Sequence, residues 1–279
     1  MSSTLLGFEP VLGDEQWMQF VRDGYLRLGR VVDGEELADL QQRIDDIMLG
    51  KAQVEYDQMM FQLDSDTGQY GDVGPQTKGH KGSTLNYRKI EQLELDPVFL
   101  AYMQKPLFRE ICARTYGVHV PVGCFRAMFM NKPAHKGTLL PWHQDRWSDL
   151  DRDPLATLWL ALDPATRENG CVQIISASHR FGVINPSHGS GFLTEAQMAE
   201  HCPEDQIEFL ELEAGEAVLL HNWLLHRSDT NRSDIPRRAF SVNYLDARTV
   251  SQGGRSFPVM FGEGALKPES LGRFAPVNA

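Results

Sequence analysis

The sequence predicts a mainly β protein built on a double-stranded β-helix, or jelly roll, with helices packed outside it. From residue 118 onward, seven short runs are apolar or alternate between apolar and polar residues, and Gly, Pro, Asn and Asp separate them. Helical periodicity is confined to the first part, so these runs follow one another without intervening helices, as in antiparallel two-sheet folds. The runs are Val118–Val122, Phe125–Met130, Ala156–Leu162, Cys171–Ile175, Ile207–Leu212, Ala217–Leu220 and Arg237–Leu245.

The chain of 279 residues is long enough to bury a substantial core, and no gap between its motifs suggests a second domain. We therefore expect one domain over residues 1–279. Its parts would be N-terminal helices over 1–117, a jelly-roll core over 118–250 and a C-terminal segment over 251–279.

The N-terminal part carries the helical signals. Asp14 is placed to cap a first helix, which Gly24 ends, and Asp33 is placed to begin a second helix that ends near Met48. A helix pair is expected on either side of Pro106. The expected helices therefore cover about 14–23, 33–48 and 96–116, with short strands at 25–28 and 85–90.

Residues 51–84 lose periodicity and are rich in glycine, which marks a long loop. Loops of this length in a compact domain tend to be functional lids or partly disordered segments, and we expect a lid. Lys78, Lys81 and Arg88 give the segment a local positive charge that could face an anionic group of a ligand. For any one of these residues, a solvated loop position is the simpler interpretation.

The charge balance excludes several classes of partner. Lys and Arg number 27 against 38 Asp and Glu, giving a formal net charge of −11, which argues against general binding to nucleic acids or anionic membranes. No apolar run is long enough to span a bilayer, and the first residues do not resemble a secretion signal. Four scattered cysteines without zinc-like spacing suggest buried thiols in a reducing compartment, so we expect a cytoplasmic protein.

The main candidate site is the segment that contains His143 and Asp145. Side chains two residues apart on an extended segment project to the same face, so both can bind one metal ion. His226 is the best candidate for a third ligand. Two imidazoles and one carboxylate on one side of a metal leave the opposite positions open, which is typical of non-haem Fe(II) oxygenases.

Other residues compete for these roles. His221 is the serious alternative for the third ligand, although on one strand it would face away from His226. The remaining candidates have simpler interpretations: His179, His188 and His201 as packed, capping or solvated side chains, Asp149, Asp151 and Asp153 as a solvated loop, and Arg126 and Arg146 as either pocket or surface ion-pair residues.

Several segments in a fixed order together resemble the phytanoyl-CoA dioxygenase family of Fe(II)- and 2-oxoglutarate-dependent oxygenases, whose fold is a cupin-like jelly roll. They span roughly Tyr87 to Tyr244, over half of the chain, and are far more specific together than a lone His-x-Asp. These segments are YRKIE, MNKPAHKG, WHQD, WLALDPATRENGCVQIISASHR and LEAGEAVLLHNWLLHRSDTNRSDIPRR.

The resemblance implies a role for individual positions. It makes His143, Asp145 and His226 the iron ligands and Arg237 the residue that binds the distal carboxylate of 2-oxoglutarate, with help from Ser228. The planar guanidinium suits this role because it can donate two parallel hydrogen bonds to a carboxylate. Neighbouring Arg238 should face the other side. Three further positions, Lys89, Met128 and Trp159, match cosubstrate contacts in the family on a looser alignment.

The function that we expect is hydroxylation of an unactivated C–H bond with O2 and 2-oxoglutarate as cosubstrates. A carboxylate at position 145 favours hydroxylation over halogenation in such enzymes. The expected substrate is a small polar molecule, such as an amino acid derivative, an aminophosphonate or a natural-product intermediate, with contacts from Lys78, Lys81, Arg88 and Arg146. Three alternatives stay open, namely a metal-dependent isomerase of the cupin type, a hydroxylase of an acyl-CoA and a silent binding module. The sequence does not indicate an oligomeric state.

Overall fold

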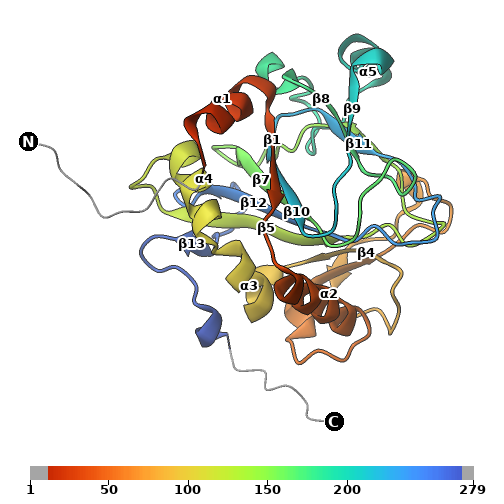
Figure 1. Ribbon diagram of the computed structural model, residues 1–279, viewed down its shortest axis with the longest axis vertical. Coiled ribbons are helices and arrows are strands. Elements are labelled where there is room, and N and C mark those ends of the chain that lie inside the picture. The colour runs from red at the N-terminus through yellow and green to blue at the C-terminus, as the bar shows by residue number, and fades with distance from the viewer. Residues whose placement is uncertain (1–11, 272–279) are drawn as a thin grey trace, which may run out of the picture.

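The computed structural model describes residues 12–271 and contains two antiparallel sheets that face each other (Figure 1). The larger sheet has nine strands, of which eight follow the order β1-β10-β7-β12-β5-β4-β2-β3, and the ninth, β13, pairs with β5. Its strands are β1 (Tyr25–Arg30), β2 (Met60–Leu63), β3 (Thr77–Lys78), β4 (Tyr87–Glu91), β5 (Val122–Met130), β7 (Ala156–Ala161), β10 (Glu216–His221), β12 (Ala239–Asp246) and β13 (Val259–Phe261).

The smaller sheet has four strands in the order β6-β11-β8-β9. They are β6 (Leu140–His143), β8 (Val172–Ile175), β9 (Ile207–Leu210) and β11 (His226–Ser228). Two facing antiparallel sheets with helices outside make the mainly β, cupin-like jelly roll that the sequence predicts. The N-terminal part contributes strands β1 to β4 to the larger sheet as well as helices.

Four helices cover the outside of the larger sheet, and Figure 1 shows α2 and α3 on the side away from β8, β9 and β11. The Asp33 side chain accepts a hydrogen bond from the Glu36 amide, and Asp96 accepts one from Val98, so both begin helices as N-caps. The helices are α1 (Asp14–Asp23), α2 (Gly34–Met48), α3 (Pro97–Met103), α4 (Pro106–Tyr116) and, at the smaller sheet, α5 (Glu195–His201).

The larger sheet packs differently on its two faces. On β7 and β12, Leu158, Phe240 and Val242 are fully buried against the helices in the main core. Trp159 and Ala239, which alternate with them, face the smaller sheet instead. Side chains on this second face of the larger sheet therefore point into the space between the two sheets.

Three expectations about the elements are wrong. Residues 118–122 do not form a strand, because Gly117 adopts φ +106° after α4 and a turn leads into Pro121; β5 begins only at Val122. Helix α5 interrupts the strand region, where Thr194 and Gln197 form a capping box. The cap of α1 is Gly13, and Asp14 lies in the first turn.

No helix within residues 12–271 is long and apolar enough to cross a membrane.

Candidate active site

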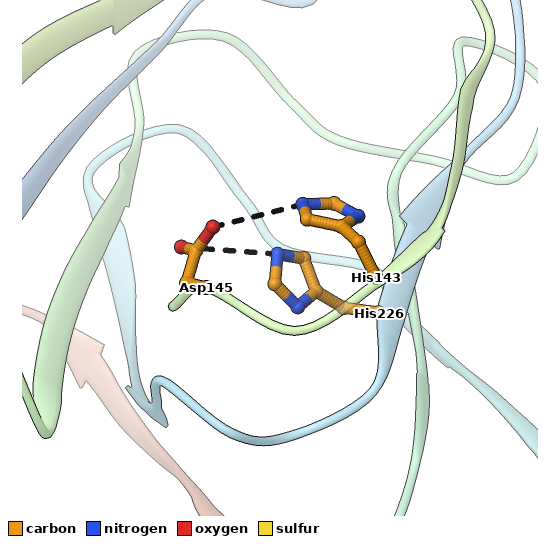
Figure 2. A group of neighbouring side chains, drawn as sticks. All are labelled: His143, Asp145 and His226. Atoms are coloured by element: carbon orange, nitrogen blue, oxygen red, sulfur yellow. Dashed lines mark ion pairs between the residues drawn. The ribbon is translucent and has the colours of Figure 1, made fainter. Parts of the chain in front are cut away.

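His143, Asp145 and His226 lie together at one end of the smaller sheet (Figure 2). His143 ends β6, His226 begins β11, and the two residues are directly paired across the ladder. Asp145 follows β6 and its amide donates to the Asn222 carbonyl oxygen at 2.7 Å, which fixes the carboxylate opposite both rings. One carboxylate oxygen lies 3.7 Å from His143 Nε2 and the other 3.9 Å from His226 Nε2.

The other nitrogen of each ring fixes its orientation. His143 Nδ1 donates to the Pro141 carbonyl oxygen at 2.8 Å, and His226 Nδ1 donates to the Leu224 carbonyl oxygen at 2.9 Å. With the proton on Nδ1, the Nε2 lone pairs of both rings point toward the Asp145 carboxylate, as in metal sites whose histidines donate their other N–H to a backbone carbonyl oxygen. Burial lowers the pKa of His143 to about 3, so this ring is neutral at physiological pH. The three side chains therefore fit a divalent metal such as Fe(II), with two neutral nitrogen ligands and one carboxylate.

His221, the alternative third ligand, belongs to a different cluster. It ends β10, and a turn separates it from β11, so the two histidines do not share one strand. Its ring lies 4.9 Å from that of His179 and 6.3 Å from that of Phe20, and its Nδ1 accepts a hydrogen bond from the Trp223 amide. This places His221 in the packing between α1 and the end of β10.

The three clustered side chains open into a cavity of about 210 Å³ between the two sheets. Its lining includes all five residues that the resemblance assigns to the cosubstrate. They are Lys89, Met128, Trp159, Ser228 and Arg237.

Arg237 is only 4% exposed, and its Nε has no hydrogen-bond partner among the described residues. The same holds for the indole Nε1 of Trp159, over whose ring the guanidinium lies at 5.5 Å. Buried donors without partners are costly, so they indicate a missing acceptor. Burial lowers the pKa of Arg237 to about 10, which leaves it charged at neutral pH. A carboxylate of a bound ligand would satisfy both donors.

Arg238, the adjacent residue, faces the other side of the sheet as expected. Its guanidinium forms ion pairs with Asp163 at 2.8 Å and Asp45 at 2.6 Å. Two neighbouring arginines therefore differ completely in environment, since one is saturated by carboxylates and the other faces the cavity unpaired.

A chain of charges runs along the wall formed by β4 and β5. Glu91 lies 3.1 Å from Lys89 Nζ and 3.1 Å from Arg126 Nε, so one carboxylate serves two cations. Burial lowers the pKa of Lys89 to about 8 despite this partner. The sequence indicates that Arg126 is either a pocket residue or an ion-pair residue. It is both, because it pairs with Glu91 and also lines the cavity.

The predicted substrate contacts divide into two groups. Arg88 lines the cavity, and Nη1 donates to Gln62 Oε1 at 2.8 Å. Lys78 and Lys81 do not reach the cavity. Both are exposed, and the Lys81 ammonium donates to the Lys78 carbonyl oxygen at 3.1 Å. Arg146 is also outside the lining, because it turns back to the Pro186 carbonyl oxygen at 3.1 Å. A substrate contact by any of these three residues therefore stays a prediction that the cavity lining does not support.

Two aromatic residues that the sequence did not single out also line the cavity. Tyr70 comes from the loop over 51–84, Phe192 comes from the loop before α5, and their rings lie 5.0 Å apart. Phe192 also contacts the ring of His143 at 5.2 Å, and Arg88 lies 5.3 Å above the Tyr70 ring. Tyr70 is the only residue of the segment 51–84 that lines the cavity, and no local pattern in the sequence identifies it.

Comparisons with known proteins agree with this geometry. The chain is 27% identical over 247 residues to a probable phytanoyl-CoA dioxygenase from Caenorhabditis elegans, covering 85% of this chain and 76% of the relative. It is 27% identical over 267 residues to the phytanoyl-CoA dioxygenase domain-containing protein 1 from Rattus norvegicus, covering 85% and 91%.

Solved structures share the fold. EctD from S. alaskensis with bound Fe has a TM-score of 0.67 at 18% identity, covering 91% of this chain and 82% of that one. The 2-oxoglutarate-dependent carbocyclase SnoK from nogalamycin biosynthesis has a TM-score of 0.65 at 16% identity, covering 89% and 90%. Residues 20–239 of the chain match the family described as phytanoyl-CoA dioxygenase (PhyH). The chain therefore belongs to the phytanoyl-CoA dioxygenase family and is a 2-oxoglutarate-dependent oxygenase that uses Fe(II).

Proposed function

We propose that this enzyme hydroxylates an unactivated C–H bond of a small polar molecule. In this proposal His143, Asp145 and His226 hold Fe(II), and Arg237 and Ser228 bind the distal carboxylate of 2-oxoglutarate. One observation carries it. The clustered metal-ligand atoms and the unpartnered donor of Arg237 face the same cavity.

Fe(II) and 2-oxoglutarate, when bound, supply the activation of O2 that oxidises a C–H bond while the cosubstrate is decarboxylated to succinate. The residues of the chain bind and orient these groups and keep water away from them. Lys89, Met128 and Trp159 line the same cavity and are proposed to contact the cosubstrate. The carboxylate of Asp145 supports hydroxylation as the outcome, because it occupies the position that a halide would need.

The cavity also supports the proposed substrate class. The lining brings Arg88 and Arg126 to the same space as the metal ligands. Amino acid derivatives, aminophosphonates and polar natural-product intermediates all carry groups that such cations bind. The four cysteines of the chain are buried and free, which supports a reducing compartment such as the cytoplasm.

A second candidate is hydroxylation of an acyl-CoA, which the names of the relatives favour. In that case only the acyl end could enter a cavity of this size, and the nucleotide would lie outside. The isomerase alternative finds no support, because an isomerase has no use for the unpaired Arg237 at the end of the cavity.

The test begins without oxygen. Purified protein receives Fe(II) and 2-oxoglutarate, and the weak visible charge-transfer band of the chelate is recorded before O2 is admitted and succinate is assayed. We expect the band in the wild type and its loss in Asp145→Ala and His226→Ala, while His221→Ala retains it. A band that persists in His226→Ala and disappears in His221→Ala would overturn the ligand assignment.

The substrate class is tested next. Stimulation of succinate formation is compared for small acids, their neutral amides and an acyl-CoA. Strong stimulation by the acyl-CoA alone would select the second candidate.

A further inference from the structure

Lys132 is a buried lysine without an ion-pair partner, although the more distant carboxylates of Asp64 and Asp229 act to raise its pKa. Its side chain lines the cavity and is 4% exposed, and its ammonium donates to the Thr138 carbonyl oxygen at 2.5 Å. Among the described residues, no carboxylate lies within ion-pair distance of it. Burying an ammonium with one neutral acceptor is unfavourable, and burial lowers the pKa of Lys132 well below its ordinary value. A position of this kind calls for an explanation beyond packing.

The backbone places Lys132 directly opposite Arg237. The Lys132 amide donates to the Arg237 carbonyl oxygen at 3.2 Å, and the Arg237 amide donates to the Lys132 carbonyl oxygen at 3.0 Å. Residues that exchange both hydrogen bonds in an antiparallel pair lie about 5.5 Å apart at Cα and project to the same face. Both side chains accordingly line the same cavity, where the Arg237 charge adds to burial in lowering the pKa of Lys132.

Arg88 adds a third cation to this end of the cavity. Its charge also acts on Lys132 and Arg237, and its hydrogen-bond acceptor, Gln62, is neutral. Like charges facing each other in a buried space destabilise the empty protein, and an anion placed among them removes that cost. These three cations therefore provide more positive charge for a bound anion than Arg237 alone would provide.

The surrounding chain is shaped around the lysine stem. A Cβ built at Gly137 would lie 2.7 Å from Lys132 Cβ, and one at Gly170 would lie 3.0 Å from Lys132 Cδ and 2.4 Å from the Asp229 carbonyl oxygen. Both glycines also have positive φ, at +89° and +79°. These close approaches hold the stem in place, so Lys132 is built into the site and does not fold over a surface.

We propose that Lys132 is a second cation for the distal carboxylate of 2-oxoglutarate and that, with Arg237, it makes the site select a cosubstrate with a distal negative charge. This inference rests on the proposed function, because it takes Arg237 as the residue that marks the carboxylate position. It assigns Lys132 a role in specificity that is separate from iron binding.

The test measures binding by calorimetry in protein loaded with Ni(II), which supports no turnover. The ligands are 2-oxoglutarate and 2-oxopentanoate, which has a methyl group in place of the distal carboxylate. In Lys132→Met we expect 2-oxoglutarate to bind at least about tenfold more weakly and 2-oxopentanoate to bind as in the wild type. Lys136→Met, an exposed lysine on the same loop, is the matched control and should behave as the wild type.

Two further measurements separate this role from a structural one. The midpoint of thermal unfolding of ligand-free Lys132→Met should be equal to or above that of the wild type, because the substitution removes a buried amine whose desolvation lowers its pKa and costs free energy on folding. Binding of 2-oxoglutarate should take up protons in the wild type and fewer in the variant, as measured in buffers of different ionisation enthalpy. Lys132→Gln keeps a donor for the Thr138 carbonyl oxygen and carries the test if Lys132→Met does not fold.

Equal losses of affinity for the two ligands, or unchanged affinity for 2-oxoglutarate, would overturn the inference and leave Lys132 with a structural role. Failure of the proposed function gives a different result. In that case the wild type itself would not distinguish 2-oxoglutarate from 2-oxopentanoate.

Discussion

The two faces of the larger sheet show how one set of strands serves both stability and chemistry. On β12, Phe240 and Val242 are fully buried against the helices, while Ser241 between them lines the cavity. On β5, Phe129 packs in the main core, while Met128 lines the cavity. Alternation along a strand puts successive side chains on opposite faces, so neighbouring residues have different tasks. The comparison predicts that substitutions one residue apart affect different measurements.

The largest expected effect on stability is on the helix-facing side. Phe240→Ala should lower the free energy of unfolding by about 3–5 kcal/mol, because a fully buried aromatic ring is lost and a cavity remains. The affinity of the folded fraction for 2-oxoglutarate should be unchanged. Denaturant unfolding and calorimetry check both. Ser241→Ala is the matched control, with a change in stability of less than about 1 kcal/mol.

The paired arginines give the next test. Arg238→Met should cost about 3 kcal/mol of stability, because Asp163, which is 7% exposed, loses its ion-pair partner. Arg237→Met should leave stability nearly unchanged but weaken 2-oxoglutarate binding by roughly 10- to 100-fold, as expected for the loss of hydrogen bonds to a charged group. Equal effects of the two changes on binding would show that the carboxylate site is misplaced.

Acid should destabilise the metal-free protein through its buried histidines. His143 and His221 have their pKa values lowered from 6.5 to about 3 and about 4, mainly by burial. The unfolded chain binds these protons below pH 6.5 and the folded chain does not, so stability is fully present above pH 6.5 and is lost as pH falls. The loss should approach about 1.4 kcal/mol per pH unit for each histidine.

Unfolding midpoints in urea between pH 7 and pH 4, with a chelator present, check this expectation. In His221→Gln the pH dependence of stability should be shallower by the slope that one histidine contributes. Gln is chosen because its side chain keeps an acceptor for the Trp223 amide. An identical pH dependence in the variant and the wild type would show that His221 does not contribute to the loss of stability in acid.

The smallest expected effect is at the aromatic pair over the cavity. Tyr70→Ala should change stability by less than about 0.5 kcal/mol, because Tyr70 is 39% exposed. It should raise succinate formation in the absence of substrate several-fold, since the Tyr70 and Phe192 rings limit access of water to the metal ligands. Leu63→Ala, at an equally exposed apolar position at the end of β2, should leave this rate unchanged.

The sequence predicted the elements whose signal is local. The helices expected from Asp33 and from Asp96 are present, and the apolar run 156–162 and the alternating run 237–245 correspond to β7 and β12. It failed where a signal is short or ambiguous. The run 118–122 is apolar, but the turn after Gly117 excludes a strand, and α5 has only seven residues, too few for a clear helical period.

The candidate site likewise contains residues that the sequence identifies and residues that it does not. Metal ligands two residues apart and an arginine in a known pattern can be read from the sequence, and Arg237 does line the cavity with His143. Which lysines reach the cavity depends on the path of the segment 51–84, which no local signal gives, and neither Lys78 nor Lys81 lines the cavity. The contact of Tyr70 with Phe192 joins residues more than 100 positions apart and has no local signal.

The pairing of His226 with His143 across β11 and β6 also makes metal binding a reporter of correct folding. Strand β11 has three residues between β6 and β8, and a slip of one residue would turn His226 to the opposite face. A molecule with that misaligned strand could be compact and rich in β structure, yet it would lack the third ligand. The stoichiometry of iron bound during refolding would therefore count the molecules that have reached the native register, which circular dichroism alone would not distinguish.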